Sequence, residues 1–283
     1  MSAFPRPHIS PSERSSFKNC EFRWKLDYVD GHRTPIYGVH LDFGTAMHSA
    51  IERHKTRKDP VPLEETVQNF RSSFTETYSK NKEKYSEKDL KNDLGFFLDA
   101  GENILRHFHE CEELSSAEVL YNEFPLFEKI DRTDGIDISF KGFIDMTVRT
   151  KSKRGETVLY VCDFKTCSWG WDIEKKRDRE VHFQVLLYKH FLCKKFGLDP
   201  KGVRTAFVLL KKKPKKGDPP VEWFPISAGP ISVQRAVDAL NEDITKMSIK
   251  LEAGTLQKNR SVCVNSFGDT CPYFNTDLCP DDR

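Results

Sequence analysis

The chain has 283 residues and a mass of 32.8 kDa, which suits one large domain and excludes a disulfide-stapled mini-protein. Its 37% hydrophobic, 12% aromatic and 31% charged residues can build a core under a polar surface, so wholesale disorder is also excluded. The formal net charge is only +2, so local basic clusters would have to bind any polyanionic partner.

The first 115 residues are predicted to be mostly helical. One helix is expected over Ser10–Tyr28, entered through a serine and a proline, and another over Gly44–His54, with an apolar side. Two or three more helices are expected over Leu63–Leu114. No run reaches the ~20 apolar residues of a membrane span, and the first residues lack the apolar stretch of a secretion signal. We therefore expect a cytoplasmic protein with no membrane partner.

The rest of the chain alternates between strand and helix patterns. Strands are expected over 118–127, 136–149, 157–166, 203–210 and 221–226, and helices over 180–196 and from 232 to about 251. The predicted fold class is α/β (α+β), one domain spanning 1–283. Its parts are a helical layer over 1–115, a core over 116–251, and a cysteine-bearing tail over 252–283.

Acidic and basic residues interrupt two of the apolar strands. Asp163 and Lys165 are two residues apart in VLYVCDFKTC, so their side chains share one face of a strand. Asp145 lies on the preceding strand, in KGFIDMTV, and a hairpin would bring it beside Asp163. Two converging carboxylates repel each other, and oxygen ligands of this kind suit Mg²⁺ or Mn²⁺. An ordinary ion pair on an edge strand would explain the Asp–Lys pair taken alone.

These residues resemble the motif of the PD-(D/E)XK nuclease superfamily, in which an Asp is followed, on a neighbouring strand, by Asp or Glu, any residue, and Lys. Two further segments resemble its RecB-like branch, which includes CRISPR-associated iron–sulfur nucleases: GTAMHSAIE with His48, and the Q-x-x-x-Y segment from Gln184 to Tyr188. Glu123, in YNEFPLF, is a weaker match to an acidic residue often found in this branch.

The resemblance implies a restriction-endonuclease-like core with a mixed central sheet flanked by helices, and a metal-dependent DNA nuclease. Its implied ligands for Mg²⁺ or Mn²⁺ are His48, Asp145, Asp163 and the carbonyl of Phe164. It also implies that Lys165 positions the attacking water, while Gln184 and Tyr188 hold the lysine strand or the DNA backbone. By analogy, an exonuclease acting in recombination, repair or phage DNA processing is expected, in the host cytoplasm if phage-encoded.

The eight cysteines fall into two groups. Cys111, Cys162, Cys167 and Cys193 lie within helix or strand patterns and are expected to be buried. Cys263, Cys271 and Cys279 recur with seven residues between them, in a tail too poor in apolar periodicity to order itself. The resemblance supplies Cys20 as a fourth ligand and implies a [4Fe–4S] cluster joining the two ends of the chain. The wide spacing leaves Zn²⁺, or unligated thiols, as alternatives.

Three basic clusters could bind DNA phosphates, at 151–154, 175–179 and 211–216. Trp169 and Trp171 lie between the first two and could stack an unpaired base, although solvated loops with turn aromatics would look the same. The sequence has no P-loop, so a helicase or recombination partner would have to supply any unwinding. The rival interpretation is a non-catalytic DNA-binding or assembly subunit that retains the nuclease fold.

Overall fold

A computed structural model describes residues 4–33, 35–56, 60–108, 110–132, 134–151, 155–264 and 270–280. The chain forms two compact units. The first comprises residues 1–36, 127–142 and 234–283, and the second comprises residues 37–126 and 143–233. Within the described residues, no helix is long and apolar enough to cross a membrane.

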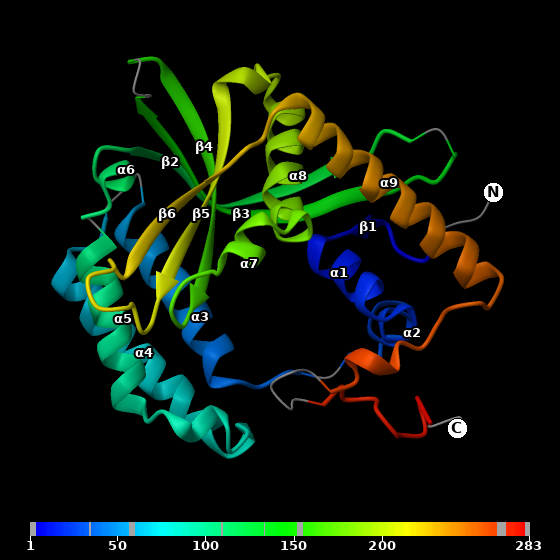
Figure 1. The fold of residues 1–283 in the computed structure, drawn as a ribbon, viewed down its shortest axis with the longest axis horizontal. Coiled ribbons are helices and arrows are strands. Elements are labelled where there is room, and N and C mark those ends of the chain that lie inside the picture. Colours follow the sequence, from blue (N-terminus) through cyan, green and yellow to red (C-terminus); the bar gives the residue numbers. More distant parts are fainter. Residues whose placement is uncertain are drawn as a thin grey trace. The chain divides into compact units, whose positions relative to one another are not determined.

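The second unit holds a mixed sheet and most of the helices (Figure 1). Its elements are α3 Val39–His54, α4 Leu63–Asn81, α5 Leu94–Phe108, α6 Glu112–Ser115, β4 Thr157–Cys167, α7 Ile173–Arg177, α8 Arg179–Phe196, β5 Val203–Lys211 and β6 Val221–Ile226. Strands β2 Glu118–Lys129 and β3 Ser139–Lys151 each have residues in both units.

The strand order is β1-β3-β4-β5-β6, where β1 is His8–Ile9, and β2 also pairs with β3. Strands β3 and β4 are antiparallel, with Met146 opposite Cys162. Strands β4 and β5 are parallel, with Asp163 opposite Phe207, and α7 and α8 lie in the connection between them, as parallel pairing requires. Strand β6 pairs antiparallel with β5. The result is the mixed α/β architecture, with a central sheet flanked by helices, that the sequence predicted.

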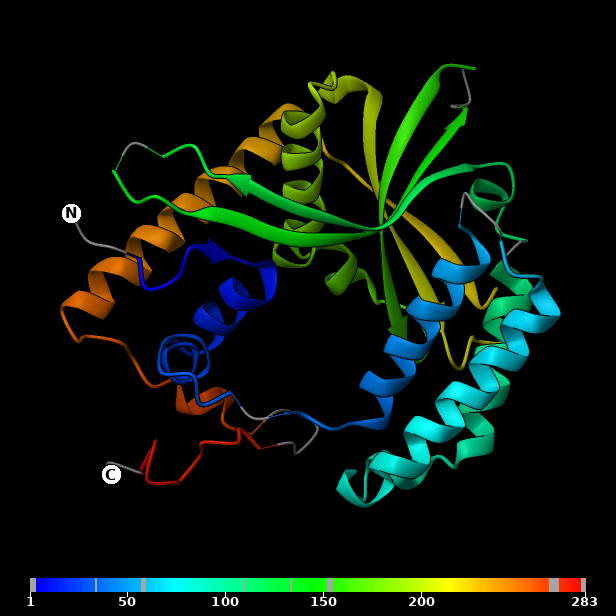
Figure 2. The ribbon, with the colours of Figure 1, turned by 180° about the vertical axis from the view of Figure 1, so that it is seen from behind.

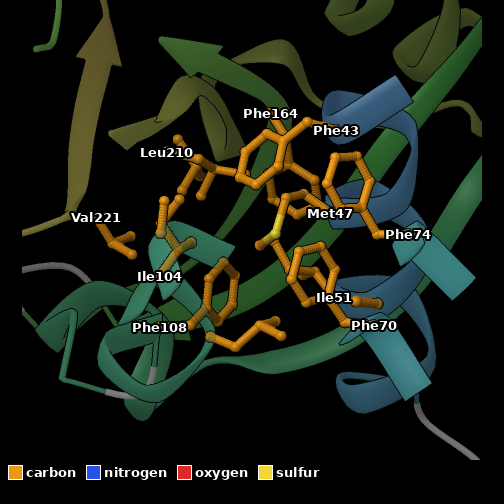
Figure 3. Packing of buried hydrophobic residues seen from close by; sticks show 14 of the residues in the cluster. Phe43, Met47, Ile51, Phe70, Phe74, Ile104, Phe108, Phe164, Leu210 and Val221 are labelled. Atoms are coloured by element: carbon orange, nitrogen blue, oxygen red, sulfur yellow. The ribbon is translucent and has the colours of Figure 1, made fainter. Parts of the chain in front are cut away.

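One face of this sheet carries the main hydrophobic core against α3, α4 and α5 (Figure 3). Alternate residues of the strands point into it, among them Met146, Phe164 and Leu210. The residues between them point to the other face, where Phe207 and Leu209 pack with Val185 of α8. Because Asp163 and Lys165 also alternate with Phe164, they point away from the main core.

A glycine brings α4 and α5 close together inside this core. A Cβ atom at Gly101 would lie only 2.1 Å from the Phe70 ring, so a larger side chain has no room. Phe70 in turn stacks against Phe74, with ring centroids 5.9 Å apart, and meets the Phe43 ring edge-on. Helices α3, α4 and α5 are therefore packed against one another largely through aromatic rings.

The first unit contains the amino-terminal helices and the long helix α9 (Figure 2). Its elements are β1 His8–Ile9, α1 Pro11–Asn19, α2 Glu21–Trp24, a π-helix over Lys25–Val29, a 3₁₀ turn over Arg260–Val262 and most of α9 Pro230–Glu252. Strand β1 is parallel to the start of β3, where Ile9 lies opposite Phe140. A buried ion pair joins α1 to α9, with 2.7 Å between Arg14 Nε and Asp243 Oδ2.

The structure corrects two expected helix boundaries and adds one short helix. The helix expected over Ser10–Tyr28 is broken at Cys20, which is extended (φ −156°, ψ 110°) and caps α2 by accepting a hydrogen bond from the Arg23 backbone N–H. Helix α3 begins at Val39 rather than Gly44. Gly44 therefore lies inside the helix. The helix passes close to β4 there, since a Cβ on Gly44 would come within 3.3 Å of Thr166 Oγ1. The short helix α7 was not predicted.

Candidate active site

The pairing of β3 with β4 sets the positions of the two predicted aspartates. One residue beyond Met146 and Cys162, the same register brings Asp145 opposite Asp163. Here the ladder gives way to a side-chain contact, because the backbone N–H of Phe164 donates to Asp145 Oδ2 at 2.6 Å. Asp163 is almost fully buried, at 1% exposure. The hairpin therefore delivers two carboxyl groups to one region of the sheet, as predicted.

Three elements contribute to a group of oxygen and nitrogen ligands. His48 of α3, Glu123 of β2 and Asp145 of β3 each offer one ligand atom, and these atoms lie within 4.8 Å of one another. His48 Nδ1 is 3.7 Å from Asp145 Oδ2. The His48 ring also meets the Phe164 ring edge-on, at 5.4 Å between centroids, and interacts with the Phe164 carbonyl. The predicted ligands His48, Asp145 and Phe164 are thus neighbours.

Glu123 was the weakest match in the sequence, yet the structure places it in this group. Its φ of +45° lies in the left-handed region, which a non-glycine residue adopts at a cost of about 1–3 kcal/mol. The adjacent Asn122 amide donates to the backbone carbonyls of Glu52 and Lys55 at the end of α3, at 3.0 and 3.2 Å. This tie holds β2 against α3 and turns the Glu123 carboxyl toward His48.

The electrostatics of this group favour a cation. Burial raises the pKa of Asp145 well above its usual value, and the Asp163 charge adds to the effect. Burial likewise raises the pKa of Glu123, with repulsion from Glu52 and Asp163. Burial lowers the pKa of His48, which keeps its imidazole neutral and able to donate a lone pair. A divalent ion would remove the carboxylate repulsion, and one His with carboxylate oxygens suits Mg²⁺ or Mn²⁺.

Lys165 makes its close contacts with Asp163 and Gln184, outside this ligand group. Its Nζ is 2.8 Å from Asp163 Oδ2 and donates to Gln184 Oε1 at 3.1 Å, and Gln184 Nε2 donates to Tyr188 Oη at 2.8 Å. Burial opposes the charge of Lys165, but Asp163 and then Asp145 outweigh it and raise the pKa of the ammonium. The predicted helix pair Gln184 and Tyr188 therefore fixes the lysine, and Asp163 is its counter-ion rather than a member of the ligand group within 4.8 Å.

The four predicted cluster cysteines all belong to the first unit. Cys20 Sγ accepts from the Arg23 and Asn259 backbone N–H groups, at 3.5 and 3.4 Å, and Cys271 N donates to the Cys263 carbonyl at 2.7 Å. Burial raises the pKa of the Cys279 thiol, and the Cys263 and Cys20 thiols raise it further, so these three lie near one another. Among the described residues, no three cysteine sulfurs lie within 4.8 Å of each other.

The other four cysteines are buried or half-buried. Cys162 and Cys193 are buried, while Cys111 and Cys167 are half-buried and pack against hydrophobic clusters.

Of the predicted basic cluster at 151–154, residues 152–154 lie outside the described residues. Trp171 is 9% exposed and packs against Phe207, so it is unavailable for stacking on a base, whereas Trp169 is 61% exposed.

Comparison with known proteins gives one positive result. A family model described as PD-(D/E)XK nuclease superfamily matches residues 8–280, which is nearly the whole chain. The comparison with curated proteins gives no match. The matched range includes His48, Asp145, Lys165 and every other residue of the site described above.

Proposed function

The chain belongs to the PD-(D/E)XK nuclease superfamily, and we propose that it is a metal-dependent deoxyribonuclease, most simply an exonuclease, that hydrolyses DNA phosphodiester bonds. The observation that carries the proposal is the ligand group of His48, Glu123 and Asp145 beside a buried Asp163–Lys165 pair. We also propose that the chain belongs to the RecB-like branch and that it acts in recombination, repair or phage DNA processing.

The residues of the site divide the chemistry between them. His48, Glu123 and Asp145 would hold a Mg²⁺ or Mn²⁺ ion, with the Phe164 carbonyl available beside His48. Such an ion, when bound, polarises the phosphate and lowers the pKa of bound water. Lys165 would orient the attacking water and offset the charge that builds on the phosphate oxygens.

Asp163 and Gln184 keep the lysine ammonium in that position. Asp163 is 1% exposed, and its backbone lies opposite Phe207 of β5. The strand that carries it is therefore fixed within the sheet. Tyr188 contacts Gln184 and so acts one step further from the reacting atoms, as a positioning residue. This arrangement supports a fixed amine beside the proposed ion, a combination that can assist phosphodiester hydrolysis.

The proposal is tested by separating metal binding from catalysis. We expect Asp145→Asn to abolish tight Mn²⁺ binding in calorimetry and to lower DNA cleavage by at least about 100-fold. Lys165→Gln should lower cleavage by a similar factor and leave the Mn²⁺ dissociation constant within about threefold, because its amine is not a ligand. Cleavage that survives both substitutions unchanged would refute the assignment of the active site to these residues.

The same cleavage assay distinguishes a nuclease from the rival interpretation, a non-catalytic subunit. If the wild-type protein binds DNA and Mn²⁺ but cleaves neither single-stranded nor duplex DNA, it is a non-catalytic DNA-binding or assembly subunit. Substrates labelled at one end separate the two nuclease modes, since an exonuclease releases the terminal label as short products, and an endonuclease yields long fragments. A helicase or recombination partner, if required, would appear as stimulation of cleavage on duplex ends.

We also propose that Cys20, Cys263, Cys271 and Cys279 hold a [4Fe–4S] cluster. Two backbone N–H groups already donate to Cys20 Sγ, as they do to thiolates in such sites, and the Arg260 guanidinium lies 3.7 Å from Cys279 Sγ. A single Zn²⁺ ion would need four sulfurs about 2.3 Å from one centre, which is a tighter group than these thiols form. The tail over 252–283 would then be ordered by the cluster and pack on the amino-terminal helix.

Metal analysis tests this second proposal. Protein purified without oxygen should be brown and carry about four iron atoms per chain, and Cys20→Ser should lose most of them. Cys111→Ser, a change at a half-buried cysteine outside the group, should leave the iron content unchanged. About one zinc ion per chain, or neither metal, would contradict the iron–sulfur assignment.

A further inference from the structure

The loop between β4 and α7 exposes one tryptophan. Trp169 is 61% exposed, and its indole makes no ring contact or hydrogen bond with any described residue. A side chain of this size is rarely left so open without a use, because its burial would be strongly favourable. It follows Lys165 by four residues along the same segment, which is roughly 13 Å of extended chain.

The loop that presents Trp169 is firmly held. The backbone N–H groups of Lys212 and Lys213 donate to the carbonyls of Cys167 and Ser168, at 2.9 and 2.7 Å. On the other side, Trp171 is anchored with its ring 4.9 Å from Phe207. The backbone that carries Trp169 is therefore fixed, which lowers the entropic cost of ordering this loop when a flat partner binds.

Some of the lysines beside this loop have a carboxylate partner, and others do not. Glu222 neutralises Lys211 and Lys176, at 2.8 and 2.5 Å. Among the described residues no carboxylate pairs with Lys212 or Lys213. Lys212 is 8% exposed with its Nζ 5.5 Å from the Phe43 ring centre.

Lys213 is exposed, and its Nζ donates to Asn92 Oδ1 at 3.0 Å and lies over the Phe96 ring. Burial lowers the pKa of Lys212, and repulsion from Lys213 adds to this shift. An anionic group bound here would relieve that repulsion.

We propose that Trp169 and the exposed Lys213 form a subsite that stacks one unpaired nucleobase and binds its neighbouring phosphate, so that the preferred substrate is a single-stranded or frayed DNA end. The proposal rests on the proposed nuclease function for its substrate class. Aromatic stacking combined with basic side chains is the means by which proteins bind single strands without reading sequence. The backbone contact of this loop with Lys212 and Lys213 favours a polyanion over a protein partner.

Binding without cleavage tests the subsite. Metal-free protein would be titrated against fluorescein-labelled oligothymidylate and against a blunt duplex of equal length, with anisotropy as the readout. We expect Trp169→Ala to weaken single-strand binding by about 5- to 150-fold, which corresponds to the loss of one stacked base. Trp169→Phe should restore most of the affinity, and Lys213→Gln should reduce the slope of log K against log salt by about 0.7.

Controls keep the outcomes separate. Ile231→Ala, at an apolar residue that is 69% exposed, should leave single-strand binding unchanged. Cleavage of a small phosphodiester such as bis(p-nitrophenyl) phosphate should be the same in wild type and Trp169→Ala, so its absence from both would count against the nuclease proposal instead. The subsite is refuted if Trp169→Ala binds oligothymidylate within twofold of wild type, or if it weakens single-strand and duplex binding equally.

Discussion

At the scale of single residues, the site holds buried carboxyl groups whose charged forms are unfavourable until a cation binds. Asp145 and Glu123 both have pKa values raised by burial and by other carboxylates, and Glu123 also adopts a left-handed backbone conformation. Such costs are typical of functional positions, where stability is given up for geometry. The ligands should therefore be among the positions where substitution stabilises the metal-free protein.

Asp145→Asn is expected to stabilise the metal-free protein at neutral pH by about 1–2 kcal/mol, because it removes a buried charge while keeping an acceptor for the Phe164 N–H. The pKa of Asp145 is raised on folding, so its penalty is absent at low pH and grows as pH rises from its unfolded value through its folded value. Denaturant melts at pH 4 and pH 7.5 would show a gap between variant and wild type only at the higher pH.

The matched control for that experiment is Asp137→Asn, because the Asp137 side chain is 80% exposed and, among the described residues, pairs with Lys129 alone. Its effect should stay within about 0.5 kcal/mol at both pH values. A variant at Asp145 that is less stable than wild type at pH 7.5 would show that the carboxylate is not strained.

The contacts of Gln184 and Tyr188 predict different effects on turnover. Gln184→Ala removes the acceptor that fixes Lys165, so kcat should fall by about tenfold with little change in KM. Tyr188→Phe removes only a group that binds Gln184, so kcat should fall by threefold at most. Steady-state kinetics on a labelled strand measure both, and equal losses would mean that Tyr188 itself contacts the substrate.

At the scale of elements, the aromatic core between α4 and α5 positions the helix that carries His48. Phe43 of α3 meets Phe70 and Phe74 of α4 edge-on, at 6.0 and 5.8 Å between ring centroids. Gly101 allows α5 to pack on the same ring of Phe70. The ligand group thus depends on a layer of packing that contains no ligand.

Gly101→Ala should destabilise the protein by about 1–3 kcal/mol, because the new Cβ would overlap the Phe70 ring. Gly95→Ala in the same helix is the control. Its Cβ would lie 3.4 Å from Asp93 Oδ1, an ordinary contact, and alanine favours helix, so a gain of up to about 1 kcal/mol is expected. Thermal melts of the two variants should move in opposite directions, and similar shifts would rule out the clash.

Local periodicity was enough to predict most elements of the sheet and the face on which Asp163 and Lys165 lie. It also predicted that Asp145 would meet Asp163, since a hairpin of apolar strands has few registers that bury both faces. It could not weight Glu123 correctly, because a left-handed glutamate leaves no mark on the sequence. Nor could it show that Cys20 breaks a helix, since cysteine is not among the residues that usually cap one.

At the scale of the whole molecule, metal binding and folding stability should be linked. Because three segments distant in sequence bring the ligands together, an ion that binds only the folded chain stabilises it. The effect is about 2.7 kcal/mol at a concentration 100 times the dissociation constant.

Mn²⁺ should therefore raise the Tm of wild type, and a chelator should reverse the shift. The shift should be larger at pH 8 than at pH 6, because Asp145 and Glu123 have raised pKa values and must lose protons to bind the ion. Asp145→Asn should show almost no shift. A Tm that does not respond to Mn²⁺ in wild type, measured by differential scanning fluorimetry, would count against the ligand group.

The chain passes between the two compact units four times, after residues 36, 126, 142 and 233, and two of these passages lie inside strands β2 and β3. No single cut can therefore release either unit as a continuous polypeptide. An insertion or duplication that shuffles whole modules at the gene level could not exchange one unit without breaking both strands that carry Glu123 and Asp145. The nuclease centre and the cysteine-bearing unit are consequently expected to be inherited together.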